Sequence, residues 1–587
     1  MNFSELINAL TSNTSHSLHL FRPELALCVT IVAMLLVRIC RLEKCLPGGL
    51  IALIGTTAGL YFAVQGSHLL DCFGENPPQI HRVELFSGML VYDAFTAYFR
   101  ALLLFFGVLF VIFTQLSGIP DREDAPDFYS LVLGATIGMC LMASANHLLM
   151  IFLGVEMASV PSYALAGFLK GRRQSSEAAL KYAVYGAGAA GIMLYGLSLL
   201  AGVLGSCHLP TMAAQLADGL ANGTLADKYV VLALGGLMTG VGLCFKLSAV
   251  PFHFWCPDVF EGASAEVNAF LSVASKAAAL ALLVRVVAGI GYVPVHDELR
   301  SKGTVGFNVA DTPNAVPASS PQGDVNSPST AKSPPDAAIR PSERPQVAAL
   351  KPIREFMALV VAFIAAITCT FGNLAAYGQT NIKRLLAYST IAHAGYMLMP
   401  VVPALLMVGP FSKDAEQAIG AITLYTALYL FMNLGAFAIV AFLRNSLRSE
   451  QIADYAGLIR RSPGIVICFS ILLFSLVGLP PLAGFTGKFV IFTSLVTAFQ
   501  KNTYGPLMLA LLAVAGLNTV FSLFYYLRVV KVMALDPEPE HRAPQEFSLL
   551  SLSGGFVVLL TLPVLWLGIW WNGLLQLARS AALNLFS

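Results

Sequence analysis

The sequence has few charged residues and no cysteine pattern that would bind a metal or an iron–sulfur cluster. Only 12% of its 587 residues are charged, and the formal net charge is +2. Such a nearly neutral chain gives no sign of a nucleic-acid-binding face. Its ten cysteines form no CxxC pair, no Cys/His zinc pattern and no iron–sulfur spacing. We therefore expect this chain to hold no cofactor and to carry no electrons.

Long apolar runs make up most of the sequence. The chain is 57% hydrophobic, and its runs repeatedly reach the roughly 20 residues that a helix needs to cross a bilayer. The sequence therefore predicts an all-α polytopic membrane protein with about 14 transmembrane helices. Their expected starts lie near residues 24, 48, 92, 127, 146, 177, 229, 266, 356, 385, 418, 464, 506 and 548.

Basic residues between the apolar runs predict the orientation. Arg38, Arg41 and Lys44 follow the first span, and LKGRR, NIKR, RNSLR and LRVVK follow spans 5, 9, 11 and 13. All of these segments lie on one side of the predicted bundle, which should be cytoplasmic because basic loops stay inside. We therefore expect a multi-pass inner (plasma) membrane protein with both termini extracytoplasmic.

Residues from about 295 to 352 interrupt the apolar pattern. They are rich in Pro, Ser and Ala and almost free of large apolar groups, so they cannot bury enough surface to fold alone. The predicted organisation is helices 1–3 in 1–126, helices 4–8 in 127–294, a disordered extracytoplasmic loop in 295–355, helices 9–13 in 356–535, and a loop with helix 14 in 536–587.

Several ionisable residues fall inside the predicted spans, which is unusual because a central charge costs about 2.5 to 3.5 kcal/mol on insertion scales. They are Glu156, Lys246, Lys276 and Lys488, with Lys181 and His393 nearer to helix ends. A single residue of this kind could snorkel or form a structural ion pair, but four favour a buried polar path. Desolvation favours neutral lysine and a carboxylate favours ammonium, so a Lys–Glu pair suits proton exchange. Arginine would stay protonated.

Two of the lysines lie beside predicted helix breaks. Lys246 precedes Pro251, and Lys488 ends the segment GLPPLAGFTGK. Interrupted helices in corresponding halves of a transporter point to an inverted repeat with an ion site near the midplane. We therefore expect discontinuous helices 7 and 12 and two inverted five-helix repeats, helices 4–8 and 9–13. Either break taken singly could also serve packing alone.

The segment YGAGAAG contains a G-x-G-x-x-G pattern at Gly186, Gly188 and Gly191. A dinucleotide site would need a preceding strand in a soluble βαβ unit, whereas this segment lies inside predicted span 6. We interpret these glycines as small residues that let a neighbouring helix approach closely.

Three segments carry a resemblance to a known family. They are FKLSAVPFHFWCPDVFEGASAEVNAFLSVASKAAALALL, NIKRLLAYSTIAHAGYMLM and GLPPLAGFTGKFVIF, and they closely resemble the antiporter-like membrane subunits of respiratory complex I, the proton-translocating NADH-quinone oxidoreductase. The resemblance covers nearly all spans and fails only in 295–352. Two features narrow the resemblance to one type of subunit: the segment GVEMASVPSYALAGF, and the presence of a lysine and not a glutamate at position 488.

The resemblance implies roles for individual residues. Glu156 matches the family's helix 5 glutamate, Lys246 its helix 7 lysine, Lys276 its helix 8 lysine and Lys488 the lysine of broken helix 12. Lys181 matches a further lysine with a less certain role, and His393 occupies a polar central position. The family likeness also implies proton conduction in this chain, with NADH, FMN, iron–sulfur clusters and quinone handled by other subunits, and neighbouring membrane subunits and the bilayer as partners.

Two other classes stay open at this point. A subunit of a multi-subunit cation/proton antiporter would share the buried lysines, whereas a structural scaffold would need none of them. Because the sequence stops at Ser587, soon after span 14, we expect it not to be the distal complex I subunit, which carries a long lateral helix. We also expect that Cys72 and Cys207 are able to pair, since both lie in loops on the predicted outer face.

Overall fold

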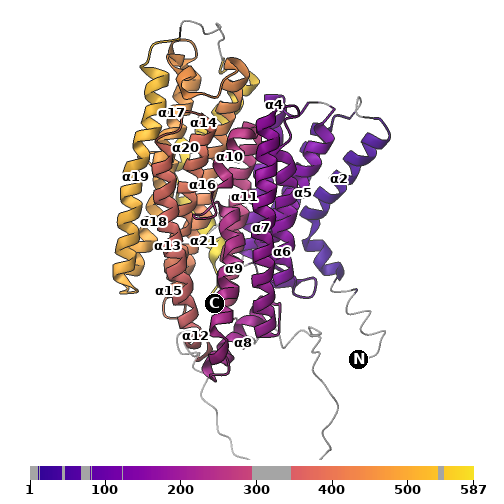
Figure 1. Ribbon diagram of the computed structural model, residues 1–587. Coiled ribbons are helices and arrows are strands. Elements are labelled where there is room, and N and C mark those ends of the chain that lie inside the picture. Colours follow the sequence, from indigo (N-terminus) through magenta and orange to yellow (C-terminus); the bar gives the residue numbers. More distant parts are fainter. Residues whose placement is uncertain are drawn as a thin grey trace, which may run out of the picture.

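The computed structural model is a bundle of long helices lying side by side (Figure 1). It describes residues 11, 14–42, 46–67, 80, 82–121, 123–293, 345–539 and 548–586. Within these residues, 12 helices are long and apolar enough to cross a membrane, or 13 if the bent pair Thr14–Leu20 and Arg22–Ile39 counts as one span. The predicted all-α, multi-pass membrane fold is confirmed.

The first half of the chain forms the part of the bundle drawn in indigo to magenta in Figure 1. Its elements are α2 (Arg22–Ile39), α3 (Gly48–Ser67), β1 (Val83–Leu85), β2 (Leu90–Tyr92), α4 (Ala94–Ser117), α5 (Ala125–Ser144), α6 (Leu148–Ala166), α7 (Arg173–Leu204), α8 (Leu209–Ala221), α9 (Tyr229–Leu247), α10 (Trp255–Gly262) and α11 (Ala265–Gly291). The strands β1 and β2 pair antiparallel, with Glu84 opposite Val91, in a small hairpin that the sequence analysis did not predict.

The second half forms the part drawn in red to yellow (Figure 1). Its elements are α12 (Pro345–Ala349), α13 (Lys351–Ala376), α14 (Ile382–Leu398), α15 (Val401–Met407), α16 (Ser412–Leu447), α17 (Pro463–Val477), α18 (Ala483–Gln500), α19 (Gly505–Ala534), α20 (Leu552–Ile569) and α21 (Asn572–Ala582).

The predicted count of 14 spans is not confirmed, although every predicted start lies within a few residues of an observed helix. The first span is bent by 79° where α2 begins. The span expected near residue 464 is divided into α17 and α18, neither of which alone has the length and hydropathy to cross. The predicted discontinuity of this helix is therefore what lowers the count.

The predicted loop at 295–355 is wrong at its C-terminal end and lies for the most part outside the described residues. The chain is helical from 345, because α12 and α13 already begin at Pro345 and Lys351. Val347 and Leu350 are buried. The Pro-rich composition hid these two apolar side chains, which pack against the bundle.

The innermost helices are α11, α14 and α16. The buried shares of their apolar windows are 89% for α11, 94% for the span Ile382–Met407 that α14 forms with α15, and 94% for α16, against 28% for the peripheral α19. Side-chain caps fix where two of them begin. The Ser264 hydroxyl accepts from Val267 N at 3.3 Å at the start of α11, and the Asn381 side chain accepts from Lys383 N at 2.9 Å at the start of α14.

The glycine interpretation is confirmed at one of the three positions. A Cβ on Gly186 would lie 2.0 Å from the Tyr163 hydroxyl of α6, whereas nothing lies within 4 Å of a Cβ on Gly188 or Gly191. All three glycines lie within α7, so the pattern follows no strand. Backbone atoms of α7 and α9 approach closely at Gly196, where a Cβ would lie 2.6 Å from Thr239 N.

Candidate functional site

Three of the predicted lysines are buried at successive places across the bundle. Lys246 lies in the last turn of α9, Lys276 in the middle of α11 and Lys488 near the start of α18. Their exposed fractions are 1%, 2% and 3%. Helix α11 packs against α9 and α14, and α14 packs against α16 and α18, so the three side chains form a row that we call the lysine row.

Glu156 and Lys246 lie at one end of the lysine row. The Lys246 ammonium donates to the Ser159 hydroxyl at 3.0 Å, and Ser159 is one turn further along α6 than Glu156. Glu156 is half-buried, and its Oε1 has no hydrogen-bond partner among the described residues. The two charges interact electrostatically. They are not within ion-pair distance, and the acceptor of the Lys246 ammonium is the serine hydroxyl.

The chain breaks directly after Lys246, as the sequence predicted. Helix α9 ends at Leu247, Ser248 takes a left-handed conformation with φ of 57°, and α10 starts only at Trp255. Pro251 lies within this break. Lys246 is therefore held at the carboxyl end of a helix, next to carbonyl groups that lack the next turn of hydrogen-bond donors.

Lys276 reaches from α11 to α14. Its ammonium donates to the Thr390 carbonyl oxygen at 2.8 Å. No carboxylate of the described residues lies within ion-pair distance of it. A backbone carbonyl accepts a hydrogen bond but cannot take up a proton, so Lys276 has a polar neighbour without a counter-charge.

His393 lies one turn beyond Thr390 on α14 and is surrounded by hydroxyl groups. Its Nδ1 is 2.7 Å from the Tyr425 hydroxyl of α16, and its Nε2 is 3.4 Å from the Tyr526 hydroxyl of α19. Tyr526 in turn hydrogen-bonds to Ser389. Hydroxyl and imidazole groups can each donate and accept, so this cluster could relay a proton.

Lys488 lies against the second helix break. Its ammonium donates at 2.8 Å to the carbonyl oxygen of Val477, the last residue of α17, and lies 4.3 Å from the centre of the Tyr396 ring. The backbone turns at Gly478, with φ of 91°. Gly484 then packs so closely that a Cβ there would lie 1.7 Å from the Ser475 carbonyl oxygen. Both predicted discontinuities are thus present, each beside a buried lysine.

Lys181 is the predicted residue that lies apart from the lysine row. Its ammonium pairs with Glu177 at 2.9 Å and with Asp258 of α10 at 2.8 Å, and its side chain is 37% exposed. Asp258 also lies 3.4 Å from Arg384. Lys181 therefore belongs to an ion-pair network at the end of the bundle. The four-residue spacing of Glu177 and Lys181 is the sequence signal for this pair.

The sequence analysis missed the hydroxyl groups that lie between the lysines. On α14, Ser389, His393 and Tyr396 recur at helical spacing and therefore share one face. That spacing could have identified the polar face of a helix that is otherwise apolar. Tyr425 and Tyr526 had no such signal, because each is one tyrosine in a long apolar helix.

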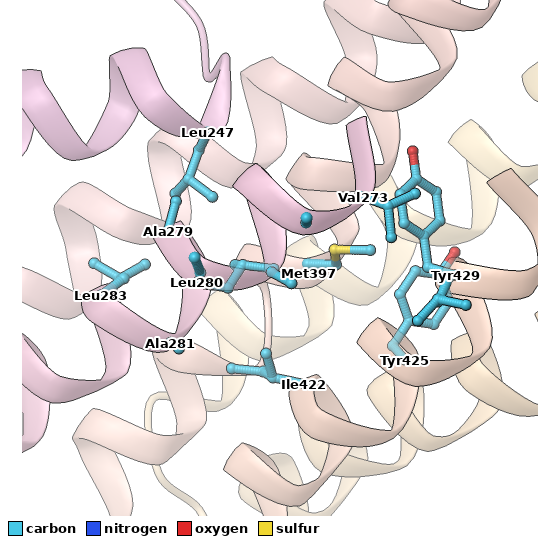
Figure 2. Close-up of a cluster of buried hydrophobic side chains, with 14 of the residues drawn as sticks. Leu247, Val273, Ala279, Leu280, Ala281, Leu283, Met397, Ile422, Tyr425 and Tyr429 are labelled. Carbon is cyan, nitrogen blue, oxygen red and sulfur yellow. The ribbon is translucent and has the colours of Figure 1, made fainter. Parts of the chain in front are cut away.

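Apolar side chains enclose the lysine row. Figure 2 shows Leu247 beside Ala279, and Met397 near Val273 of α11, with Tyr425 and Tyr429 of α16 alongside.

Among the described residues, no three His, Cys, Asp or Glu side chains are arranged to hold a metal ion. Cys207 is a free thiol, and its suggested partner Cys72 lies outside the described residues. The site thus offers titratable groups among buried, mostly apolar side chains.

A family model agrees with this arrangement. The model described as NADH:quinone oxidoreductase/Mrp antiporter, TM matches residues 145–295 and 346–515. Those ranges contain Glu156, Lys246, Lys276, His393 and Lys488.

Curated relatives match nearly the whole chain. A protein of Anaeromyxobacter sp. (strain Fw109-5) named NADH-quinone oxidoreductase subunit N is 37% identical, with 96% of each chain covered. A protein of Sorangium cellulosum named NADH-quinone oxidoreductase subunit N 2 is also 37% identical, over 85% of this chain and 86% of its own.

Solved structures share the fold. A chain of respiratory complex I from Thermus thermophilus has a TM-score of 0.64 and 27% identity, covering 94% of this chain and 98% of that one. A chain of the Mrp complex from Dietzia sp. DQ12-45-1b has a TM-score of 0.71 but only 18% identity, with 97% and 98% covered.

Proposed function

Because the chain belongs to the NADH:quinone oxidoreductase/Mrp antiporter transmembrane family, we propose that its lysine row carries protons across the membrane. The chain is an N-type membrane subunit of a proton-pumping NADH-quinone oxidoreductase. Other membrane subunits of that complex are its partners, and the bilayer surrounds it. It takes part in the enzyme reaction as a subunit of the complex.

The observation that carries the proposal is the burial of three lysines without ion-pair partners among the described residues. Lys246, Lys276 and Lys488 each donate to a neutral oxygen: a serine hydroxyl in the first case and a backbone carbonyl in the other two. An unpaired ammonium in an apolar interior is unfavourable. Small changes in nearby charge or hydration would therefore change how readily each lysine holds a proton.

The proposed route follows the order of these groups through the bundle. A proton enters at Lys246, where the nearby Glu156 carboxylate favours the ammonium, and passes to Lys276. His393 and its tyrosine hydroxyls then relay the proton toward Lys488, from which it leaves. Redox energy released in other subunits would drive each transfer by changing the charge and hydration along this axis. NADH, FMN, iron–sulfur clusters and quinone would act only in those subunits.

Lys181 takes a different part in this proposal. Its ion pair with Asp258 joins α7 to α10, the second half of the broken helix. We assign it to positioning α10, and we retain helices 4–8 and 9–13 as two inverted repeats, because the breaks at α9/α10 and α17/α18 occupy corresponding places. We also retain an inner-membrane location with both termini extracytoplasmic.

A cation/proton antiporter is the second candidate, and it would use the same buried lysines. The Mrp likeness, at 18% identity, extends only to the fold. Proton pumping by the assembled complex should require NADH, whereas antiport would proceed without it. This difference separates the two candidates in a single membrane preparation.

The decisive experiment replaces Lys246. In Lys246→Ala the titratable group is removed together with the cost of burying a charge, so the complex should assemble while proton translocation falls at least tenfold. Lys246→Arg should be nearly as damaging, because a guanidinium stays protonated. The measurement is NADH-driven proton uptake and quinone reduction in inverted membrane vesicles, normalised to the amount of assembled complex.

A matched control is Lys413→Ala, which removes an exposed lysine near the start of α16. It should leave both activities unchanged. Full pumping by an assembled Lys246→Ala complex would contradict the proposed route. Should that variant assemble poorly, the same measurement on Lys276→Ala and Lys488→Ala decides the question.

A further inference from the structure

A buried tryptophan at the start of α10 binds the broken end of α9. Trp255 is 2% exposed, and its indole Nε1 donates to the Phe245 carbonyl oxygen at 3.0 Å. Phe245 directly precedes Lys246. The Phe245 carbonyl and the Lys246 nitrogen and Cα belong to one planar peptide group. The indole therefore fixes the position from which the Lys246 side chain starts.

This end of α9 has little other support from its own continuation. The helix ends at Leu247, and residues 248–254 are not helical. The Phe245 carbonyl accepts one backbone hydrogen bond there, from Ser248 N at 3.0 Å. The last carbonyls of a helix lack the donors of a following turn, so the Trp255 indole supplies a donor from a different helix.

Trp255 is in turn held by an aromatic side chain of α7. The Tyr182 ring stacks on the indole, with the centroids 4.3 Å apart and an angle of 9° between the planes. Tyr182 is fully buried, and its ring meets the ring of Tyr163 on α6 edge-on at 4.7 Å. Stacked and edge-on contacts fix the orientation of the rings as well as their separation. We call Tyr163, Tyr182 and Trp255 the aromatic cluster.

The aromatic cluster connects Lys246 to the helix that carries its acceptor. Tyr163 lies one turn after Ser159 on α6, and the Ser159 hydroxyl accepts from the Lys246 ammonium at 3.0 Å. One end of the cluster thus lies on the acceptor helix, and the other end binds the peptide group next to the lysine. The cluster therefore determines how Lys246 and Ser159 lie relative to each other.

We propose that Trp255 is a positioning residue for the proton site at Lys246. Its indole N–H, supported by the Tyr182 ring, holds the lysine where the ammonium binds Ser159 and stays out of ion-pair distance of Glu156. Without this support Lys246 is free to pair with Glu156, and such a pair stabilises the ammonium and hinders release of its proton. The inference rests on the proposed proton route and adds a residue to its first step.

The test uses Trp255→Phe, which keeps a ring for stacking but has no N–H donor. We expect NADH-driven proton uptake per assembled complex to fall about fivefold, as for one lost hydrogen bond. The pH dependence of uptake should also move to higher pH, because a paired ammonium retains its proton longer. Glu156 is the charged group that interacts with Lys246 among the described residues, and Tyr182 is a further titratable group near it.

The control is Trp566→Phe in α20, a tryptophan that also packs on a ring, that of Trp570 at 4.7 Å, outside the aromatic cluster. It should leave uptake and its pH dependence unchanged. A purely structural role of Trp255 would lower the amount of assembled complex and leave the pH dependence of the remaining complex unchanged.

Two variants of Tyr182 test the stacking contact separately. Tyr182→Phe keeps the ring and removes a hydroxyl that has no hydrogen-bond partner among the described residues, so it should behave like the parent. Tyr182→Leu removes the ring and should behave like Trp255→Phe. This pair decides the question if Trp255→Phe assembles poorly.

Three outcomes would contradict the inference. Parental uptake and pH dependence in Trp255→Phe, beside a defective Lys246→Ala, would overturn the role of Trp255 and leave the proton route standing. Equal behaviour of Tyr182→Phe and Tyr182→Leu would exclude the stacking contact. Normal uptake in an assembled Lys246→Ala complex would overturn the proton route and this inference with it.

Discussion

At the scale of single residues, the chain places ionisable side chains in two contrasting surroundings. Lys276 and Lys488 are buried with a backbone carbonyl as their hydrogen-bond acceptor, whereas Arg285 forms a bidentate pair with Asp93 at 2.6 and 2.5 Å. An ion pair keeps both of its buried side chains charged, because removing one partner of a buried pair costs about 3 to 5 kcal/mol. Lys276 and Lys488 have no such ion pair among the described residues, and the proposed proton route uses this difference.

Glu84 in the hairpin provides a prediction about pH. Burial alone would raise the pKa of its carboxyl, but the hydrogen bond and charge of His208, with Arg82 and Asn146, lower the pKa below 4.5. The carboxylate therefore adds stability above pH 4.5, and this stability is lost as the pH falls through the lowered pKa. Glu84→Gln should cost about 1 to 2 kcal/mol at pH 7. The difference from the parent should shrink below about pH 4.5.

Thermal unfolding of the purified protein at several pH values measures this effect. The control Glu123→Gln changes an exposed carboxyl in the loop before α5 and should shift the midpoint at no pH. A Glu84→Gln deficit that is equal at pH 7 and pH 4 would mean that the charge of Glu84 contributes nothing.

At the scale of elements, the two broken helices explain why lysines occupy their ends. The last carbonyls of a helix lack intrahelical donors, and the helix dipole favours a cation there by about 0.3 to 1 kcal/mol. Lys246 lies in the last turn of α9, and Lys488 donates to Val477, the last residue of α17. The break between α17 and α18 thus supplies an acceptor for the Lys488 ammonium that an unbroken apolar helix would lack, whereas Lys246 donates to Ser159 of α6.

The packing of α7 against α9 provides a prediction about glycines. A Cβ on Gly196 would meet backbone atoms, Thr239 N at 2.6 Å and Gly235 O at 2.7 Å, which cannot move aside. Gly196→Ala should therefore destabilise the subunit by about 1 to 3 kcal/mol. Gly188→Ala on the same helix meets nothing within 4 Å and should be nearly neutral. Thermal stability and the amount of assembled complex measure both variants, and equal behaviour of the two would contradict the close approach.

At the scale of the whole molecule, contacts hold the two halves of the bundle together at one end. Nη1 of Arg354 donates to the Gly291 carbonyl at 3.2 Å and to the Val347 carbonyl at 2.9 Å. These two residues lie on either side of residues 294–344. The Tyr292 ring also lies 6.2 Å from that of Phe586, so the end of α11, the start of the second half and the C-terminal residues meet there (Figure 1).

Because one arginine bridges Gly291 and Val347, a short linker should be able to replace most of the segment between them. We expect deletion of residues 300–340 to leave assembly and NADH-driven pumping largely intact. The same deletion combined with Arg354→Gln should reduce assembly. Loss of both assembly and pumping on deletion alone would mean that the segment binds a partner.

Orientation can be tested with cysteine labelling in a chain that is otherwise cysteine-free. A membrane-impermeant maleimide should reach Ser320→Cys from outside spheroplasts, because the positive-inside rule places that segment extracytoplasmically. In a second variant that keeps only Cys40, this exposed cysteine at the C-terminal end of α2 should react only after permeabilisation. The reverse pattern would invert the proposed orientation.

The sequence by itself determined the membrane class, the approximate starts of the predicted spans, both helix breaks and the burial of Lys246, Lys276 and Lys488. These features depend on local quantities: the length of an apolar run, the missing donor of proline and the cost of a charge within a span. Tertiary structure alone decided the partners. It placed Ser159 against Lys246, separated Lys181 from the lysine row, and chose Gly196 over Gly188 for close packing. Those outcomes depend on which face of one helix packs against which neighbouring helix. The sequence of an apolar run does not specify that packing.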